Sequence, residues 1–267
     1  MIVGSKDDTE QTLLGEIVAQ HLERRLGRPV QRKLALGTTA MVYQAVLAGQ
    51  ISVYPEYTGT IQTVLLREQA SADAGMALER ARTEAARIAQ LELMEPLGLD
   101  SPPAVVVRAI DAARLHIQTL SAAAAAKNEW KLGVSFEFEE RADALPALNK
   151  YHLPMAAPVR GMAPRQLFTA LENRDLSMIV VPFNDGRLLS PDWTALGDDL
   201  KVFSPQQACL LARQDSLSAE PKLRPALAEL SAKFTNGIMR KLNAQVDVQH
   251  RPVAEVAAGF LASAGLK

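Results

Sequence analysis

Apolar and polar positions in the first 60 residues alternate between strand-like and helical patterns. Apolar residues cluster in short runs or recur at the 3.6-residue spacing of a helix. The expected elements are a strand over residues 2–4, a helix that Gly27 ends, an extended segment over residues 30–36, a helix opened by residues 37–39, and a strand over residues 51–54 that Pro55 hands over to a loop. This order predicts a parallel sheet covered by helices, with ligands bound beyond the carboxyl ends of its strands. We therefore expect three loops at one rim: residues 5–11, 37–39 and 54–60.

A second alternating pattern follows a helical stretch over residues 70–93 and the prolines at 96, 102 and 103. The elements expected there are strands over residues 104–108, 131–136, 177–181 and 209–213, and helices over residues 121–128, 137–150, 164–173, 225–242 and 253–264. The strand over residues 209–213 returns to the first lobe. We therefore predict lobe I from residues 1–104 plus 211–267 and lobe II from residues 105–210, with crossings near Val105 and Leu211 that act as a hinge.

Composition narrows the class of protein. The 267 residues are 48% hydrophobic and 22% charged, which is typical of a globular protein with room for two cores of roughly 100–150 residues each. With 29 basic and 30 acidic residues and no basic tract, the chain lacks the charge pattern of a nucleic-acid-binding protein. The single cysteine, Cys209, excludes an internal disulfide, and the start of the chain carries no signal-peptide pattern.

Catalytic and metal-binding motifs are missing from the sequence. It contains no nucleophile elbow, no phosphate-binding glycine loop and no zinc-protease motif. Glu139 and Glu140 are adjacent, and neighbouring helical residues point about 100° apart, so they do not form a catalytic pair. The four histidines lack metal spacing, and we expect each at the surface: His21, His116, His152 and His250. The sequence favours a binding protein without cofactor or metal over an enzyme.

Three stretches carry a family resemblance: GSKDDTEQ at residues 4–11, leading into LGEI at 14–17; YPEYTGT at 54–60; and FEFEERAD at 136–143. In this order they resemble the osmoprotectant (glycine betaine, choline, quaternary amine) binding proteins of ABC importers. The resemblance implies a periplasmic-binding-protein fold, with two α/β lobes joined by a two-strand hinge and a ligand cleft between them. It also implies a monomeric periplasmic protein that catalyses nothing and delivers a small solute to ABC permease and ATPase subunits.

The resemblance also implies ligand contacts by Lys6, Tyr57, Thr60 and Arg141. Cationic side chains and a hydroxyl together can hold a carboxylate through charge-assisted hydrogen bonds, and an aromatic face attracts a trimethylammonium group. A plainer interpretation remains open for Arg141, which follows Glu137 by four residues and would then form a surface pair on a helix. Thr38, at the expected start of a helix, is either a cap or an anion contact.

The sequence departs from the family where the resemblance implies further aromatic residues around the cation. The matching positions are Pro103, Pro182 and the pair Gln206-Gln207, with Phe183 beside one of them. We expect Phe183, Gln206 and Gln207 to contact the ligand, and quaternary amines to bind weakly, because each cation–π contact contributes roughly 0.5–2 kcal/mol. Two alternatives remain: the same class of protein with an unrelated polar ligand (an amino acid derivative, opine or sugar-like solute), and a two-lobed transferase or effector domain of a regulator.

Overall fold

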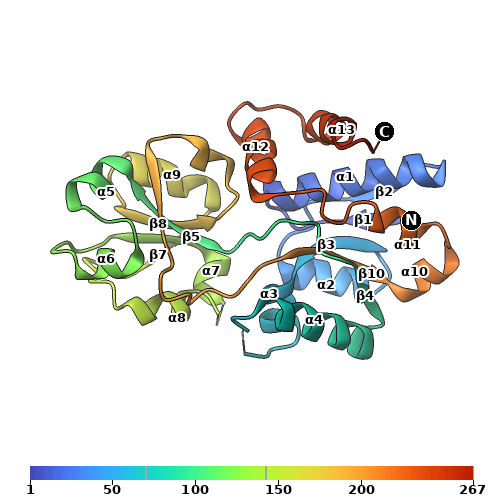
Figure 1. The fold of residues 1–267 in the computed structure, drawn as a ribbon, viewed down its shortest axis with the longest axis horizontal. Helices are drawn as coiled ribbons and strands as arrows, with labels where there is room; N and C mark the ends of the chain where they lie inside the picture. The colour runs from blue at the N-terminus through green and yellow to red at the C-terminus, as the bar shows by residue number, and fades with distance from the viewer. Residues whose placement is uncertain (70, 142, 267) are drawn as a thin grey trace. The chain divides into compact units, whose positions relative to one another are not determined.

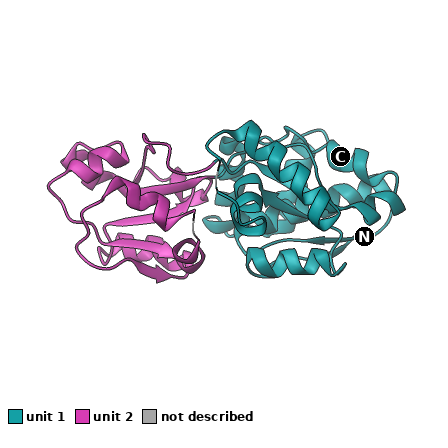
Figure 2. Ribbon diagram, turned by 90° about the horizontal axis from the view of Figure 1, so that it is seen from below, with its two compact units in different colours: residues 1–101, 205–267 teal, residues 102–204 magenta. Residues whose placement is uncertain are grey.

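The computed structural model describes residues 1–69, 71–141 and 143–266, so Ala70, Ala142 and Lys267 lie outside it. The chain forms two compact units, Met1–Ser101 with Pro205–Lys267 (unit 1) and Pro102–Ser204 (unit 2), coloured separately in Figure 2. The crossings therefore do not lie at the predicted residues. Val105 pairs with Val180 inside one sheet, and Leu211 pairs with Leu93 inside the other. Both residues therefore lie within a unit, and the chain crosses between the units after Ser101 and after Ser204.

The sheet of unit 1 has the strand order β2-β1-β3-β10-β4. Its strands are β1 (Ile2–Gly4), β2 (Gln31–Lys33), β3 (Val53–Tyr57), β4 (Leu91–Leu93) and β10 (Ala208–Arg213). β1 pairs parallel with β2 and β3, as the βαβαβ pattern predicts, but β10 runs antiparallel to β3 and β4. The parallel arrangement predicted for the first three strands is confirmed, and β10 is antiparallel because it arrives directly from unit 2, without the crossover helix that a parallel neighbour requires.

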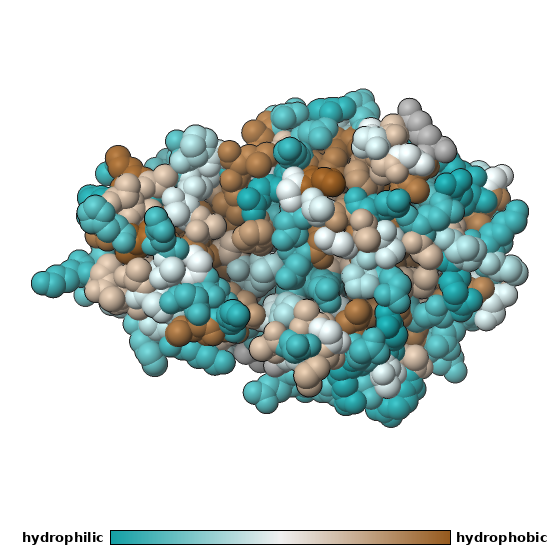
Figure 3. Space-filling model, in the orientation of Figure 1, coloured by the Kyte–Doolittle hydropathy of each residue, from teal (hydrophilic) through white to brown (hydrophobic). Residues whose placement is uncertain are grey.

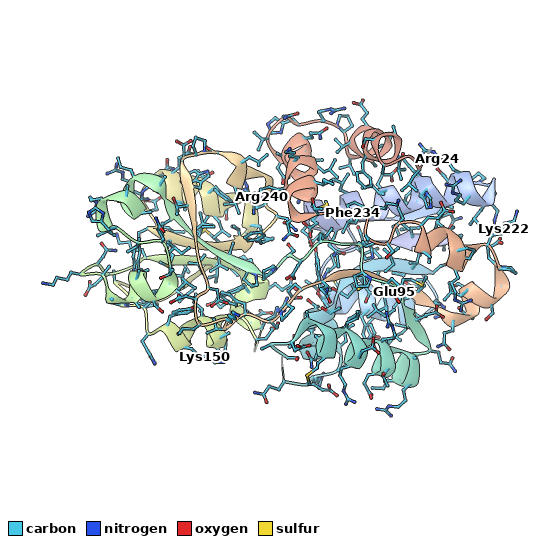
Figure 4. All side chains as sticks on the ribbon, viewed as in Figure 1. Arg24, Glu95, Lys150, Lys222, Phe234 and Arg240 are labelled. Carbon is cyan, nitrogen blue, oxygen red and sulfur yellow. The ribbon has the colours of Figure 1, made fainter. Side chains whose placement is uncertain are left out.

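Helices cover both faces of this sheet, as Figure 1 shows. They are α1 (Thr9–Leu26), α2 (Thr39–Leu47), α3 (Thr58–Thr60), the π-helix η1 (Ile61–Leu65), α4 (Ala74–Ala89), α10 (Gln214–Ala219), α11 (Leu223–Ala228), α12 (Asn236–Asp247) and α13 (Val253–Ser263). One core joins α1 to the C-terminal helices, where Phe234, labelled in Figure 4, stacks on Phe260. The other core joins α2 and α4 to the opposite face. The single helix expected over residues 225–242 is two helices. The second begins at Asn236, because the Thr235 hydroxyl caps it by accepting a hydrogen bond from the Ile238 N–H.

β3 continues through Pro55 rather than ending there. β1 pairs with β3 only at Val53, so beyond that residue β3 is bonded to β10 alone and tolerates the missing proline N–H. As a result Glu56 and Tyr57 belong to a sheet strand, and α3 begins directly after them.

The sheet of unit 2 has the strand order β7-β6-β8-β5-β9. Its elements are β5 (Pro103–Arg108), β6 (Leu132–Ser135), β7 (Arg160–Met162), β8 (Met178–Pro182), β9 (Trp193–Leu196), α5 (Ala109–Leu115), α6 (Leu120–Ala125), α7 (Phe136–Glu140), α8 (Leu145–Leu148), α9 (Pro164–Glu172) and the 3₁₀ helices η2 (Asn149–Tyr151) and η3 (Gly186–Leu189). β6 is parallel to β7 and β8, whereas β5 is antiparallel to β8 and β9. The continuous helix expected over residues 137–150 is wrong: Arg141 is extended, and Pro146 fits only the first turn of a new helix.

The surface is mixed in character. Figure 3 shows hydrophilic residues over much of the visible face, with apolar residues among them. Exposed large apolar side chains come from separate elements, such as Met76 of α4 and Ile110 of α5. Within residues 1–69, 71–141 and 143–266, no helix combines the length and apolarity needed to cross a membrane.

Candidate ligand-binding site

Lys6 and Glu56 form a buried ion pair in unit 1. The Lys6 Nζ lies 2.6 Å from Glu56 Oε1, and the two side chains are 7% and 0% exposed. The same ammonium lies 3.5 Å from the Thr39 hydroxyl at the start of α2. The charge of Lys6, which the sequence assigns to a ligand carboxylate, is therefore balanced inside the protein, although an ammonium has three protons to donate.

Tyr57 belongs to the same cluster. Its hydroxyl donates a hydrogen bond to Glu10, and the Lys6 ammonium lies 4.9 Å from the centre of its ring. Burial, and after it the Glu10 carboxylate, raises the pKa of the Tyr57 hydroxyl well above its ordinary value, so the side chain is a neutral phenol. One face of the ring thus already attracts an internal cation.

Glu10 extends the cluster to the C-terminal helices. Its second carboxylate oxygen accepts a hydrogen bond of 3.2 Å from Asn243 Nδ2 in α12. The cluster therefore joins one lysine to two carboxylates, with a formal charge of −1. Glu10, Glu56 and Asn243 were missing from the candidates predicted from sequence, although both glutamates lie within the motifs that carry the resemblance.

Thr60 and Gln206 come together across 146 positions of sequence. Gln206 Oε1 accepts hydrogen bonds from the Thr60 N–H at 3.2 Å and from the Thr60 hydroxyl at 3.3 Å. Both residues are buried, at 1% and 5% exposure respectively. Two sequence-predicted candidates therefore contact each other through a shared oxygen.

The two remaining unit 1 candidates, Thr38 and Gln207, make no such side-chain pair with another candidate among the described residues. Thr38 is exposed at the N-cap of α2, and its side chain makes no capping bond within the part of the chain that is described; Thr39 is the residue that reaches Lys6. The Gln207 backbone N–H donates to the Thr58 hydroxyl at 3.2 Å, while its side-chain oxygen is buried and accepts no hydrogen bond from the described residues. Gln207 is thus tied to the first residue of α3 by its main chain.

In unit 2, Arg141 is the C-cap of α7. Its guanidinium forms two hydrogen bonds with Asp143, at 2.9 and 2.7 Å, so a carboxylate two residues away already neutralises its charge. Arg141 has extended rather than helical backbone, so the helical spacing from which the sequence suggested a surface pair with Glu137 does not hold at this residue. Any ligand carboxylate at Arg141 therefore competes with Asp143.

Phe183 and the two prolines lie at the end of the unit 2 sheet. Pro103 and Pro182 are register partners across β5 and β8, and the Phe183 N–H donates to the Pro102 carbonyl. Phe183 is partly buried against the core of this unit. The fold thus brings together two positions where the resemblance implies aromatic residues and the chain has proline.

One of the four histidines does not lie where the sequence predicts. His21 is fully buried in α1, so its expected surface position is wrong, and its Nε2 lies 2.9 Å from the Ala226 carbonyl. Across the described ranges, no group of three or more His, Cys, Asp or Glu side chains could hold a metal ion.

Comparisons with known proteins agree with this fold. Among solved structures, a glycine betaine/carnitine/choline ABC transporter protein matches with a TM-score of 0.85 at 22% identity, covering 100% of this chain and 99% of the other. Apo YehZ of Escherichia coli matches with a TM-score of 0.75 at 26% identity, over 100% of this chain and 99% of the other. The predicted two-lobed periplasmic-binding-protein fold is confirmed.

Sequence matches to known proteins cover nearly the whole chain. The carnitine transport binding protein OpuCC of Listeria monocytogenes is 27% identical over 97% of this chain and 85% of its own length. The glycine betaine-binding protein YehZ of Escherichia coli is 29% identical over 98% and 90%. The ergothioneine transport permease/ergothioneine binding protein EgtU of Helicobacter pylori is 27% identical over 100% of this chain, which spans only 48% of that protein.

The family assignment follows from the extent of one further match. Residues 1–263 match OpuAC, the substrate binding domain of ABC-type glycine betaine transport systems. The match includes all three motifs on which the resemblance rested, and it covers both units. The chain belongs to this family of substrate-binding domains of ABC importers.

Proposed function

We propose that this protein is the periplasmic solute-binding subunit of an ABC importer, and that it carries a small zwitterion of the betaine class to a permease and its ATPase without catalysing a reaction. The observation that carries the proposal is the match of residues 1–263 to the family. The curated relatives named for glycine betaine and carnitine support the class of solute.

The polar cluster of unit 1 supports a contact with a zwitterion. Lys6 keeps a proton beyond those directed at Glu56 and Thr39, and it can donate that proton to a solute oxygen. Because Glu56 balances the lysine charge, this contact is weaker than one to an unpaired lysine. Contacts of the solute with Thr38, Tyr57, Arg141, Phe183 and Gln207 stay predictions.

The cation end of the solute finds little aromatic surface in this chain. Lys6 covers one face of Tyr57, and proline stands at residues 103 and 182. Each missing cation–π contact weakens binding by roughly 0.5–2 kcal/mol. Three missing contacts at about 1 kcal/mol each raise the Kd by a factor of about 150, which brings a site of roughly micromolar Kd close to millimolar. We therefore expect glycine betaine and choline to bind with a Kd no better than roughly 100 μM.

A second candidate is the same transport role for a more polar amino acid derivative. Gln206, 5% exposed, places a buried amide where the resemblance implies an aromatic ring, and an amide suits a solute with hydrogen-bonding groups. The relative EgtU is named an ergothioneine binding protein, which belongs to this broader chemistry.

A thermal-shift panel tests the proposal. The panel contains glycine betaine, carnitine, choline, ergothioneine, proline, arginine and neutral sugars, each at 10 mM. A solute at 100 times its Kd stabilises the native protein by about 2.7 kcal/mol, which raises the Tm of a protein of this size by several degrees. We expect at least one betaine-type solute, and no sugar, to do so. A panel without any shift, or a metabolite turned over by the purified protein, contradicts the proposal.

A further inference from the structure

Gln206 is fixed at the point where the chain re-enters unit 1. Its backbone N–H donates to Asp100 Oδ1 at 2.6 Å, and its carbonyl accepts from the Ser101 N–H at 3.0 Å. The next residue, Gln207, forms an antiparallel bridge with Asp100. The backbone N–H and the carbonyl of Gln206 are therefore both hydrogen-bonded, and these bonds fix the position from which its side chain extends.

The side-chain oxygen of Gln206 occupies a place built to hold an oxygen. The Thr60 N–H and the Thr60 hydroxyl converge on it at 3.2 and 3.3 Å. These two donors lie where the chain turns from strand β3 into α3, in the heptapeptide that carries the family resemblance. Gln206 is itself only 5% exposed and lies over Thr60, which is 1% exposed.

Gly59 shows how closely the Gln206 amide packs on α3. A Cβ added to Gly59 would lie 2.4 Å from Gln206 Nε2 and 2.7 Å from the Pro205 carbonyl oxygen. The second of these atoms is backbone and cannot move aside, so a side chain at residue 59 is excluded. Glycine thus allows the amide to reach the Thr60 donors.

A carboxylate competes with an amide for such a pair of donors. Charge-assisted hydrogen bonds to a carboxylate are roughly twice as strong as those to a neutral oxygen. The amide is nevertheless tethered to the same chain, which gives it a high effective concentration at Thr60. A solute that brings a carboxylate to Thr60 must displace Gln206 first.

We propose that Gln206 is a specificity-determining residue: it occupies the oxygen-binding position of Thr60 and so weakens the binding of solutes that present a carboxylate there. The inference rests on the proposed function, because it takes Thr60 as a point of solute contact. It inverts the role expected from sequence, in which Gln206 simply contacts the solute.

The test compares solutes that share a trimethylammonium group but differ in their carboxylate. Glycine betaine and carnitine have a carboxylate, whereas choline has none. One net hydrogen bond changes an equilibrium constant by about two- to tenfold, so removing the Gln206 oxygen from the two Thr60 donors in Gln206→Ala should raise the affinity for glycine betaine and carnitine about tenfold. The affinity for choline should change less than about twofold.

Gln206→Glu is the opposite variant. Its carboxylate has nearly the same shape as the amide and accepts the Thr60 hydrogen bonds more strongly, so it should lower the affinity for glycine betaine below that of the wild type. Gln44→Ala is the matched control, because Gln44 is an exposed glutamine of α2 outside the predicted solute contacts, and it should leave all three affinities within about twofold. Adding Thr60→Val to Gln206→Ala removes one of the freed donors and should reverse part of the gain.

Isothermal titration of these variants, each first confirmed as folded by circular dichroism, decides the matter. A carboxylate-specific gain in Gln206→Ala together with a loss in Gln206→Glu supports the inference. It is overturned if Gln206→Ala binds glycine betaine and carnitine no better than the wild type, or gains equally for choline. The proposed function is judged separately, by whether the wild type binds a betaine-type solute of the thermal-shift panel.

Discussion

Removing Lys6 from its buried ion pair with Glu56 should be one of the most destabilising single changes in unit 1. Glu56 is fully buried, its Oε1 accepts from Lys6, and its Oε2 finds no hydrogen-bond partner among the described residues. Lys6→Met therefore leaves an uncompensated buried carboxylate. Removing one partner of a buried pair typically costs about 3–5 kcal/mol, whereas replacing both charges costs far less. We expect a loss of about 3–5 kcal/mol for Lys6→Met and of about 1–2 kcal/mol for Lys6→Met with Glu56→Gln.

Two probes separate the units in the assay. Both tryptophans, Trp130 and Trp193, lie in unit 2, so their fluorescence follows that unit. The single cysteine, Cys209, lies buried in β10 of unit 1, and burial raises the pKa of its thiol to about 12. A thiol reagent should therefore label Cys209 only when unit 1 opens, because the thiolate is the reactive form.

The comparison is a urea titration of each variant followed by Cys209 labelling and by fluorescence. Lys6→Met should move the labelling transition to lower urea, and the double variant should recover most of the loss. Lys222→Met, at an exposed lysine labelled in Figure 4, is the control and should shift stability by less than about 0.5 kcal/mol. A Lys6→Met variant within about 1 kcal/mol of the wild type, or a double variant less stable than the single one, would refute the cost assigned to an unpaired Glu56 carboxylate.

Two further predictions concern titrating groups in unit 1. Burial lowers the pKa of His21 below its ordinary 6.5, so the unfolded chain binds a proton that the native protein excludes. The free energy of unfolding should be constant above about pH 6.5 and should fall below that pH by at most about 1.4 kcal/mol per pH unit. In His21→Asn, followed by Cys209 labelling, this fall should be smaller. An unchanged pH profile in the variant would contradict the role of His21. Burial raises the pKa of Asp100, against the opposing hydrogen bond from the Gln206 N–H, so its stabilising effect is present at acid pH and is lost as pH rises above its ordinary range. Asp100→Asn keeps an oxygen acceptor without the charge and should change stability at pH 7 by no more than about 1 kcal/mol, in the stabilising direction; a loss above 2 kcal/mol in urea would contradict this.

Local patterns predicted much of the fold. The periodicity of α1 and its end at Gly27, which has a φ of 66°, follow from rules that involve only neighbouring residues. The same periodicity could have predicted that His21 is buried, because His21 follows Ile17 by four residues and Val18 by three and so lies on their buried face of the helix. Pro146 likewise signalled the break in the helix expected over residues 137–150. These errors came from weighing local signals, and better use of the same rules corrects them.

The pairings inside the site depend on contacts that local rules do not reach. Lys6 and Glu56 lie 50 positions apart, and Thr60 and Gln206 lie 146 apart. The sequence identifies each as a charged or polar residue near a motif, but only the sheet order β1-β3-β10 brings their strands together. For this reason Lys6 was expected to be available for a ligand charge, although the fold pairs it internally.

Isothermal titration of the wild type with glycine betaine, carnitine, choline and ergothioneine tests whether this protein binds one betaine-type solute without transforming it. We expect saturable binding of one molecule per chain for at least one of these solutes, which should be recovered chemically unchanged. The Kd for glycine betaine and for choline should be no better than roughly 100 μM. Absence of saturable binding for all four solutes would contradict the proposed class of ligand. Low-micromolar binding of glycine betaine or choline would contradict the reading of the site as poor in aromatic contacts.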